Sequence, residues 1–147
     1  MLIGQYETKI SRKRRIAVPN KLRRNLGKKF IIARWYEGCL VLVGEDGWEK
    51  LMGRLTANMG HVTQTVRDTD RFILGSAFEV TPDPQGRVVI PEILSKYAHI
   101  KNDVIFLGLG DRAEIWDKTL WRKREEHVTA NSVKLMEEMA KEDRPRG

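Results

Sequence analysis

Short runs of apolar residues separated by polar ones fill the first fifty residues, and their length predicts strands rather than long helices. The strand candidates are RIAV at 15–18, KFIIAR at 29–34 and CLVLV at 39–43, all rich in residues that strands favour. A helix, PNKLRRNL, is predicted to begin at Pro19, because proline suits a first helical turn, and to end at Gly27. The turn WYEG fits a hairpin, and another helix is predicted near Glu45.

The same order of elements returns 72 residues later, so the chain contains an internal repeat. YETKISRKRRIAVPNKL from Tyr6 aligns with FEVTPDPQGRVVIPEIL from Phe78. In the second copy the helix PEILSKYA is predicted to stop near His99, the strands DVIFLG and AEIWD follow around the turn LGDR, and a helix begins near Asp117. Each copy is too small to bury its own apolar face, so two copies together are expected to close one barrel.

The repeat divides the chain into four predicted parts. They are a first repeat at 1–52, a helical connector at 53–74, a second repeat at 75–125, and a C-terminal helix and tail at 126–147. The connector reads as a helix interrupted around Gly60, with Arg67, Arg71 and Phe72 expected to pack between the copies. The tail places Val133, Met136, Met139 and Ala140 on one helical face, a pattern typical of subunit or domain packing.

Charge is distributed unevenly along the 147 residues. The net charge is +7, yet residues 1–72 carry +8, from 15 Lys and Arg against 7 Asp and Glu, which leaves −1 for the remainder. Such a basic half indicates a face that binds a polyanion. A single cysteine, Cys39, excludes an internal disulfide framework and suits a reducing cytoplasm. No apolar run approaches the roughly 20 residues that span a bilayer, and the first residues do not form a signal peptide.

The second copy contains Asp83-x-x-Gly86-Arg87, an apolar triplet and a proline. With the opening MLIGQYE, the strand GCLVL followed by a tryptophan, and the late AEIW, this pattern resembles the MraZ family of the AbrB-like superfamily over roughly residues 1–125. The resemblance implies a mainly β fold with helices (α+β), in which two swapped-hairpin half-barrels form one double-split β-barrel followed by C-terminal helices. It also implies a ring-forming transcriptional regulator that binds direct repeats in double-stranded promoter DNA of bacterial cell division and cell wall genes.

The first copy departs from this pattern at two positions. Ser11 stands where the family has Asp, and Arg14 stands where it has Gly. We expect Asp83 and Arg87 to form a structural pair, whereas Ser11 can offer Arg15 only a neutral hydrogen bond, which leaves Arg15 freer to reach outward. If residue 14 adopts a positive φ, its side chain costs about 1 kcal/mol.

Four consecutive cations stand directly before a short apolar run, and they are the main functional candidates. We expect Arg15 and Lys13 to face DNA and Arg12 and Arg14 to add phosphate contacts, because arginine grips phosphate or guanine through paired hydrogen bonds. The candidate DNA-binding residues are Arg12, Lys13, Arg14, Arg15, Lys21, Arg23 and Arg24. The alternative is a solvated surface with Arg15 folded back as a brace. A single loop binds weakly, so linked copies in a homo-oligomer are expected to supply avidity.

Other functional classes have less support in the sequence. His61, His99 and His127 are scattered, Cys39 lies in an apolar strand, and no phosphate-binding glycine loop is present, so we predict no enzyme, cofactor, metal or small-molecule substrate. An antitoxin-type interaction module remains an alternative, although the ordered stripe in the tail argues against a flexible partner-binding segment. An RNA binder is the other, weakened by the absence of aromatic residues in the basic loop. The expected location is the cytoplasm, on the nucleoid.

Overall fold

The computed structural model describes residues 1–56 and 62–142, and the chain divides into two compact units, residues 1–117 and 118–147. The second unit contains α5 (Lys118–Ala130) and α6 (Ser132–Glu142), and the predicted apolar residues of the tail are exposed on α6. The predicted α+β class is confirmed. The division of the chain at residues 52, 74 and 125 stays a prediction.

The elements follow the predicted order in both repeats. The first repeat contains β1 (Leu2–Lys9), β2 (Arg15–Ala17), α1 (Asn20–Leu26), β3 (Phe30–Arg34), η1 (Tyr36–Gly38) and β4 (Leu40–Gly44). The connecting helices are α2 (Glu45–Thr56), α3 (Gln64–Ile73) and η2 (Leu74–Ser76). The second repeat contains β5 (Phe78–Val80), β6 (Arg87–Val89), α4 (Glu92–Tyr97), β7 (Asp103–Gly110) and β8 (Ala113–Asp117). The predicted break around Gly60 lies outside the described residues.

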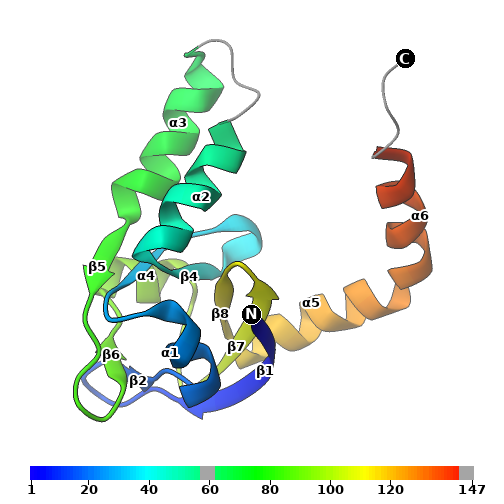
Figure 1. Cartoon of the computed structure of the whole chain (residues 1–147). Helices are drawn as coiled ribbons and strands as arrows, with labels where there is room; N and C mark the ends of the chain where they lie inside the picture. The colour runs from blue at the N-terminus through cyan, green and yellow to red at the C-terminus, as the bar shows by residue number, and fades with distance from the viewer. Residues whose placement is uncertain (57–61, 143–147) are drawn as a thin grey trace. The chain divides into compact units, whose positions relative to one another are not determined.

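The repeats exchange their first strands. Six antiparallel strands form one sheet in the order β1-β7-β8-β4-β3-β5, so β1 pairs with the hairpin of the second repeat and β5 pairs with the hairpin of the first (Figure 1). Strands β2 and β6 form a separate two-stranded sheet, here called the ribbon. The six-stranded sheet is not closed, since its edge strands β1 and β5 do not pair, and the implied barrel closure is therefore not confirmed.

The register of the ribbon reveals the symmetry between the repeats. Ile16 lies directly opposite Val88, its own equivalent 72 residues later, and both side chains are buried. A pair of equivalent residues can face each other in this way only if a two-fold pseudo-symmetry axis passes between them. The two repeats therefore contribute equivalent strands to the ribbon, which contains the pseudo-symmetry axis.

Backbone hydrogen bonds at the two ends of the ribbon obey the same symmetry. The amide of Val18 donates to the carbonyl of Gly86 over 3.0 Å, and the amide of Ile90 donates to the carbonyl of Arg14 over 2.8 Å. Each repeat's turn is thus tied to the residues that lead into the other repeat's helix. The turn at 11–14 and the turn at 83–86 consequently lie at opposite ends of the ribbon.

The hydrophobic core is shared by both repeats. It contains, from the ribbon and the residues after it, Ile16, Val18, Val88 and Ile90; from the large sheet, Leu2, Phe30, Ile32, Leu40, Leu42, Val104, Phe106, Ala113 and Ile115; and from the helices and the residue after α4, Leu22, Leu26, Leu94 and Ala98. Burial of an aliphatic or phenylalanine side chain contributes about 1.5–3 kcal/mol. Neither repeat could bury this surface alone, which is why the duplicated unit folds as one body.

Helix α3 is fastened to the sheet by one arginine. The Nε of Arg34 donates to the carbonyl of Phe72 over 2.9 Å, and its guanidinium lies 4.7 Å from the centre of the Phe72 ring. The same ring meets Tyr97 of the second repeat edge-on at 5.5 Å. Phe72 therefore packs between the repeats as expected, whereas Arg67 and Arg71 bond to groups in and just before their own helix.

The second turn is stabilised by a carboxylate. Asp83 accepts hydrogen bonds from the backbone N–H of Arg87 and of Gln85, each over 2.9 Å, and its other oxygen accepts one from the Nε of Arg87 over 2.9 Å. The hydrogen bond from the backbone N–H of Arg87 is the largest cause that holds the pKa of Asp83 below its usual value. Asp83 and Arg87 thus form a structural ion pair.

The first turn has the same backbone with different side chains. The Ser11 hydroxyl accepts the backbone N–H of Arg15 over 3.1 Å, and Arg14 adopts a φ of +56°, close to the +78° of its equivalent Gly86. A side chain in this region costs about 1 kcal/mol. A Cβ on Gly86 would collide with the guanidinium of Arg23. The equivalent of Arg23 in the second repeat is a serine, and this smaller residue leaves room for the side chain of residue 14.

The proposed compensation between the side chain at the turn and the side chain on the helix beside it can be tested. We expect Gly86→Arg to lower the free energy of unfolding by about 1–2 kcal/mol, because a side chain at positive φ costs about 1 kcal/mol and the guanidinium of Arg23 must also move away from its bond to Asn20. The double variant Gly86→Arg/Arg23→Ser should be more stable than Gly86→Arg once the effect of Arg23→Ser alone, the control, is subtracted. Urea unfolding followed by tryptophan fluorescence measures all three. A double variant no more stable than Gly86→Arg would contradict the explanation.

The carboxylate of the second turn predicts a pH dependence. Its pKa is lower in the folded chain, so the ionised Asp83 stabilises the fold above the unfolded-state pKa, and this contribution disappears as the pH falls through the folded-state pKa. The stability difference between wild type and Asp83→Asn should be constant near neutral pH and shrink below about pH 4. Ser11→Ala, in the turn without a carboxylate, should show no such change. Thermal unfolding measured between pH 2 and 7 tests this prediction. A stability difference between wild type and Asp83→Asn that stays constant over this range would contradict the role of the carboxylate.

Candidate nucleic-acid interface

The outer face of the ribbon combines two arginines with two apolar side chains. Alternation along β2 and β6 sends Ile16 and Val88 into the core. The residues between and beside them, Arg15 and Ala17 on β2 and Arg87 and Val89 on β6, point to the opposite side. Arg15 and Arg87 are half-buried, and 44% of Val89 is exposed.

The two arginines of this face are equivalent by symmetry but differ in their partners. The guanidinium of Arg87 is held by Asp83 over 2.9 Å. Across residues 1–56 and 62–142, neither a hydrogen bond nor an ion pair is found for the guanidinium of Arg15, because Ser11 binds its backbone instead of its side chain. Arg15 therefore has all of its side-chain donors available for a ligand.

Among the other cations of the first turn, two lack a protein partner in the described chain and one is hydrogen-bonded to the second repeat. Arg12 and Lys13 are exposed, and within the described part of the chain their charged groups have no protein partner. Arg14 is engaged, since its Nε donates to the carbonyl of Ile90 over 3.1 Å. Its charge also helps to lower the pKa of Glu92, after the larger effect of the hydrogen bond from Lys96. The side chain of Arg14 therefore braces the second repeat.

The predicted cations of α1 lie away from the first turn. Arg23 donates to the side-chain oxygen of Asn20 over 3.1 Å and packs against Gly86, so α1 adjoins the second turn. Lys21 and Arg24 are exposed on the same helix. The structure consequently separates the seven candidate residues into two groups at opposite ends of the ribbon.

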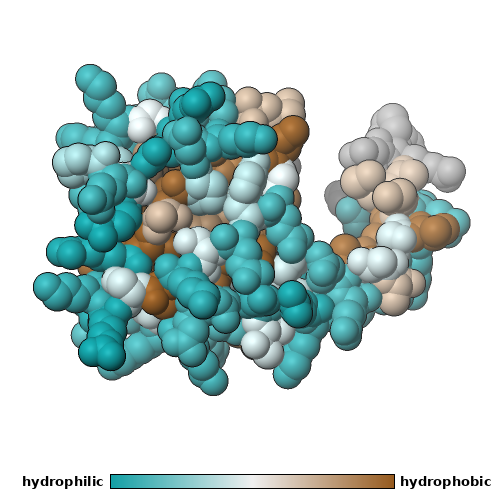
Figure 2. Space-filling view, turned by 90° about the horizontal axis from the view of Figure 1, so that it is seen from below, coloured by the Kyte–Doolittle hydropathy of each residue, from teal (hydrophilic) through white to brown (hydrophobic). Residues whose placement is uncertain are grey.

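The surface that carries the ribbon and β1 is predominantly polar. Seen from below, the first unit is covered by hydrophilic side chains with small hydrophobic areas between them (Figure 2). Such a surface is suited to a charged partner with some apolar contact, rather than to a large hydrophobic protein interface.

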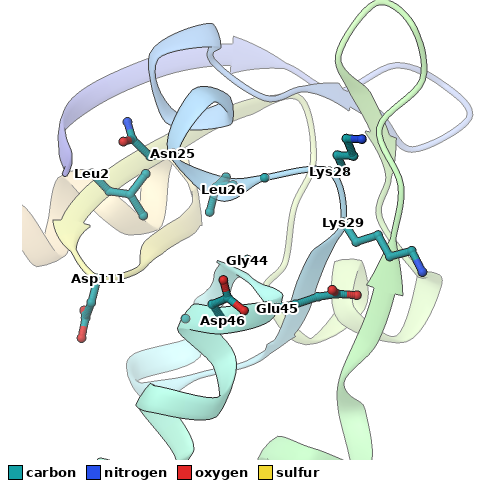
Figure 3. A pocket seen from close by; sticks show the side chains of 11 residues that line it. Leu2, Asn25, Leu26, Lys28, Lys29, Gly44, Glu45, Asp46 and Asp111 are labelled. Atoms are coloured by element: carbon teal, nitrogen blue, oxygen red, sulfur yellow. The ribbon is translucent and has the colours of Figure 1, made fainter.

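A pocket of about 440 Å³ lies between the end of α1 and the start of α2 (Figure 3). Lys28 and Lys29 line it together with Glu45 and Asp46 at the start of α2, and with Asp111. The carboxylates offset the charge of the lysines, so this pocket is a poor site for a polyanion. No group of three or more His, Cys, Asp and Glu side chains that could hold a metal ion occurs within the described ranges.

The lone cysteine belongs to the core. Cys39 is fully buried, its thiol donates to the carbonyl of Tyr36 over 3.3 Å, and burial raises its pKa. A protonated, enclosed thiol is a poor nucleophile. Among the described residues, no helix has the length and apolar character needed to cross a bilayer.

Sequence reasoning missed three features of this surface: the engagement of Arg14, the packing of Arg23 against Gly86, and the outward position of Val89. The first two join residues far apart in the sequence and leave no local signal. Alternation along RVV could have placed Val89 outside once its neighbour Val88 was assigned to the core.

Comparison with known proteins agrees with this architecture. The family model described as "MraZ protein, putative antitoxin-like" matches the chain twice, at residues 1–72 and 73–143. Proteins named Transcriptional regulator MraZ are similar over most of their length. One from Caldanaerobacter subterraneus subsp. tengcongensis is 38% identical over 93% of both chains, and one from Clostridium beijerinckii is 39% identical over 90% of this chain and 94% of its own.

A third such protein, from Thermoanaerobacter sp. strain X514, is 34% identical over 95% of this chain and 96% of its own. The name of these relatives denotes a class of proteins that is not enzymatic. Two matches to one family model also agree with the exchange of first strands between two equivalent repeats. By its sequence and its internal duplication, the chain belongs to the MraZ family.

Proposed function

We propose that this protein is a transcriptional regulator that binds double-stranded DNA through the first turn and the adjoining end of the ribbon. The observation that carries the proposal is the guanidinium of Arg15, which lies on the outer face beside two exposed cations and has no partner in the described part of the chain. The name of the relatives, transcriptional regulator, supports the same role.

Electrostatics favours a polyanion at this end. Arg12, Lys13 and Arg15 lie within four residues, and mutual repulsion of like charges is relieved when phosphates approach. Each neutralised phosphate releases counterions and adds about 0.9 to the slope of log affinity against log salt concentration. Lys21 and Arg24 on α1 would contact the backbone farther along the duplex, toward the second turn.

A few contacts per chain give weak binding, so we propose that the protein acts as a homo-oligomer, in a ring, on direct repeats in promoter DNA. Linked copies raise the effective concentration of each neighbouring turn and gain avidity from repeated sites. Promoters of cell division and cell wall genes are the proposed targets, with the protein on the nucleoid in the cytoplasm. We further propose that the ribbon and the large sheet, which share one core, act as the two parts of a split barrel.

The alternatives lead to different experiments. An antitoxin-type module would use the exposed apolar face of α6 to hold a partner protein, and an RNA binder would prefer single strands. Selection of bound sites from random duplex DNA, with native mass measured in parallel, tests the proposal. A short motif repeated at about one helical turn would support it, whereas preference for single-stranded RNA or stable co-purification of a toxin would overturn it.

The central residue of the interface gives a direct prediction. Arg15→Ala should abolish binding to the selected duplexes without a change in oligomer mass, because it removes donors that make no contact within the described protein. Gel-shift titration and light scattering measure the two properties. Lys50→Ala, which removes an equal charge from the exposed surface of α2, is the matched control and should bind normally. Unchanged DNA affinity of Arg15→Ala would disprove the assignment.

Salt dependence separates the cations of the first turn. Lys13→Ala should lower the slope of log affinity against log salt by about 0.9 for each copy bound, because a free ammonium is lost from the phosphate contacts. Arg14→Ala should lower it less, since the Nε of Arg14 is committed to the carbonyl of Ile90. Titrations between about 50 and 200 mM salt compare the variants. If the slopes of log affinity against log salt were equal for Arg14→Ala and Lys13→Ala, the hydrogen bond from Arg14 to the carbonyl of Ile90 would not restrain Arg14 from contacting phosphate.

A further inference from the structure

Val89 is the exposed apolar side chain nearest to Arg15 across the ribbon. The register places Arg15 directly opposite Val89 and Ala17 directly opposite Arg87. The backbone bonds that end the ribbon belong to the pairs Arg14–Ile90 and Val18–Gly86. By alternation Ile16–Val88 is a pair of the same hydrogen-bonded kind, whereas Arg15–Val89 and Ala17–Arg87 are not hydrogen-bonded to each other, and such non-hydrogen-bonded pairs bring their side chains closest together.

Val89 is available for contact with an apolar group of a ligand, and such a contact would remove apolar surface from water. Its neighbours Val88 and Ile90 are buried at 2% and 0% exposure, whereas Val89 is 44% exposed on the outer face. The side chain cannot turn inward, because the strand alternates and the core positions on either side are filled. The outer face therefore presents a branched apolar group directly opposite Arg15, whose guanidinium has no partner among the described residues.

Duplex DNA offers a ligand with this pair of properties. The major groove, about 12 Å wide, admits a two-stranded β-ribbon, and it displays guanine acceptors that arginine binds and the methyl group of thymine, which is contacted by apolar side chains. Other bases lack that methyl group. An arginine and a valine side by side thus match a guanine and a thymine at neighbouring positions.

We propose that Val89 is a specificity-determining residue that contacts a thymine methyl beside the base bound by Arg15. This inference rests on the proposed DNA-binding function and adds the base that the ribbon reads. The opposite end of the ribbon is poorly suited to the same task. There Ala17 presents a single methyl, and the guanidinium of Arg87 is held by Asp83.

Replacement of thymine by uracil tests the contact, because it removes the methyl group and leaves the base-pairing groups unchanged. Duplexes recovered by selection are prepared with thymine or with uracil, and wild type and Val89→Ala are titrated against both. Wild type should bind the uracil duplex about fourfold more weakly for each methyl contacted, the loss expected for exposing one methyl group. For Val89→Ala the ratio between the two duplexes should fall toward one.

Val62→Ala, the same substitution at an exposed position just before α3, is the matched control and should keep the wild-type ratio. Circular dichroism and native mass verify that each variant is folded and assembled. If Arg15→Ala abolishes binding but Val89→Ala keeps the wild-type uracil penalty, the valine contact is overturned and the DNA-binding function stands. Selected sites without a thymine next to a guanine would also overturn it. If wild type binds no duplex, the proposed function itself fails, and the contact fails with it.

Discussion

Exchange of the first strands between the two repeats is the constraint on which the rest of the structure depends. Strand β1 pairs with β7 and β5 pairs with β3, so each repeat completes the sheet of the other. The apolar faces that result meet in one core, to which both halves contribute. Because burial of that surface is the dominant stabilising contribution, the ribbon between Ile16 and Val88 is fixed by the whole fold rather than by its own few backbone bonds.

Symmetry of the backbone allows the side chains to differ between the two turns. The carboxylate of Asp83 holds its own arginine, whereas Ser11 leaves the guanidinium of Arg15 without a partner in the described chain. Arg14 replaces a glycine at positive φ, and a bond to the carbonyl of Ile90 offsets part of the strain. The two equivalent turns thus differ in role: the second holds its arginine in an ion pair, and the first exposes its cations.

Attachment of the ribbon to the core is an advantage for the proposed binding of DNA by the first turn. A ligand-binding side chain on a strand anchored in the core loses less conformational entropy on binding than one on a free loop. In the proposed function, the cations at the first turn and those on α1, which lie toward opposite ends of the ribbon, would contact different parts of a long ligand.

The sequence by itself determined the local elements, the repeat of 72 residues and the pairing of Asp83 with Arg87, because each is encoded by spacing within a few residues or by direct comparison of two segments. It also singled out the first turn as the candidate site. Only the tertiary structure decided which strands exchange, that Arg14 binds a carbonyl 76 residues away, and that Val89 faces outward across from Arg15. Those facts depend on which distant segments meet when the shared core forms, and hydrophobic periodicity carries no information about the identity of the partner.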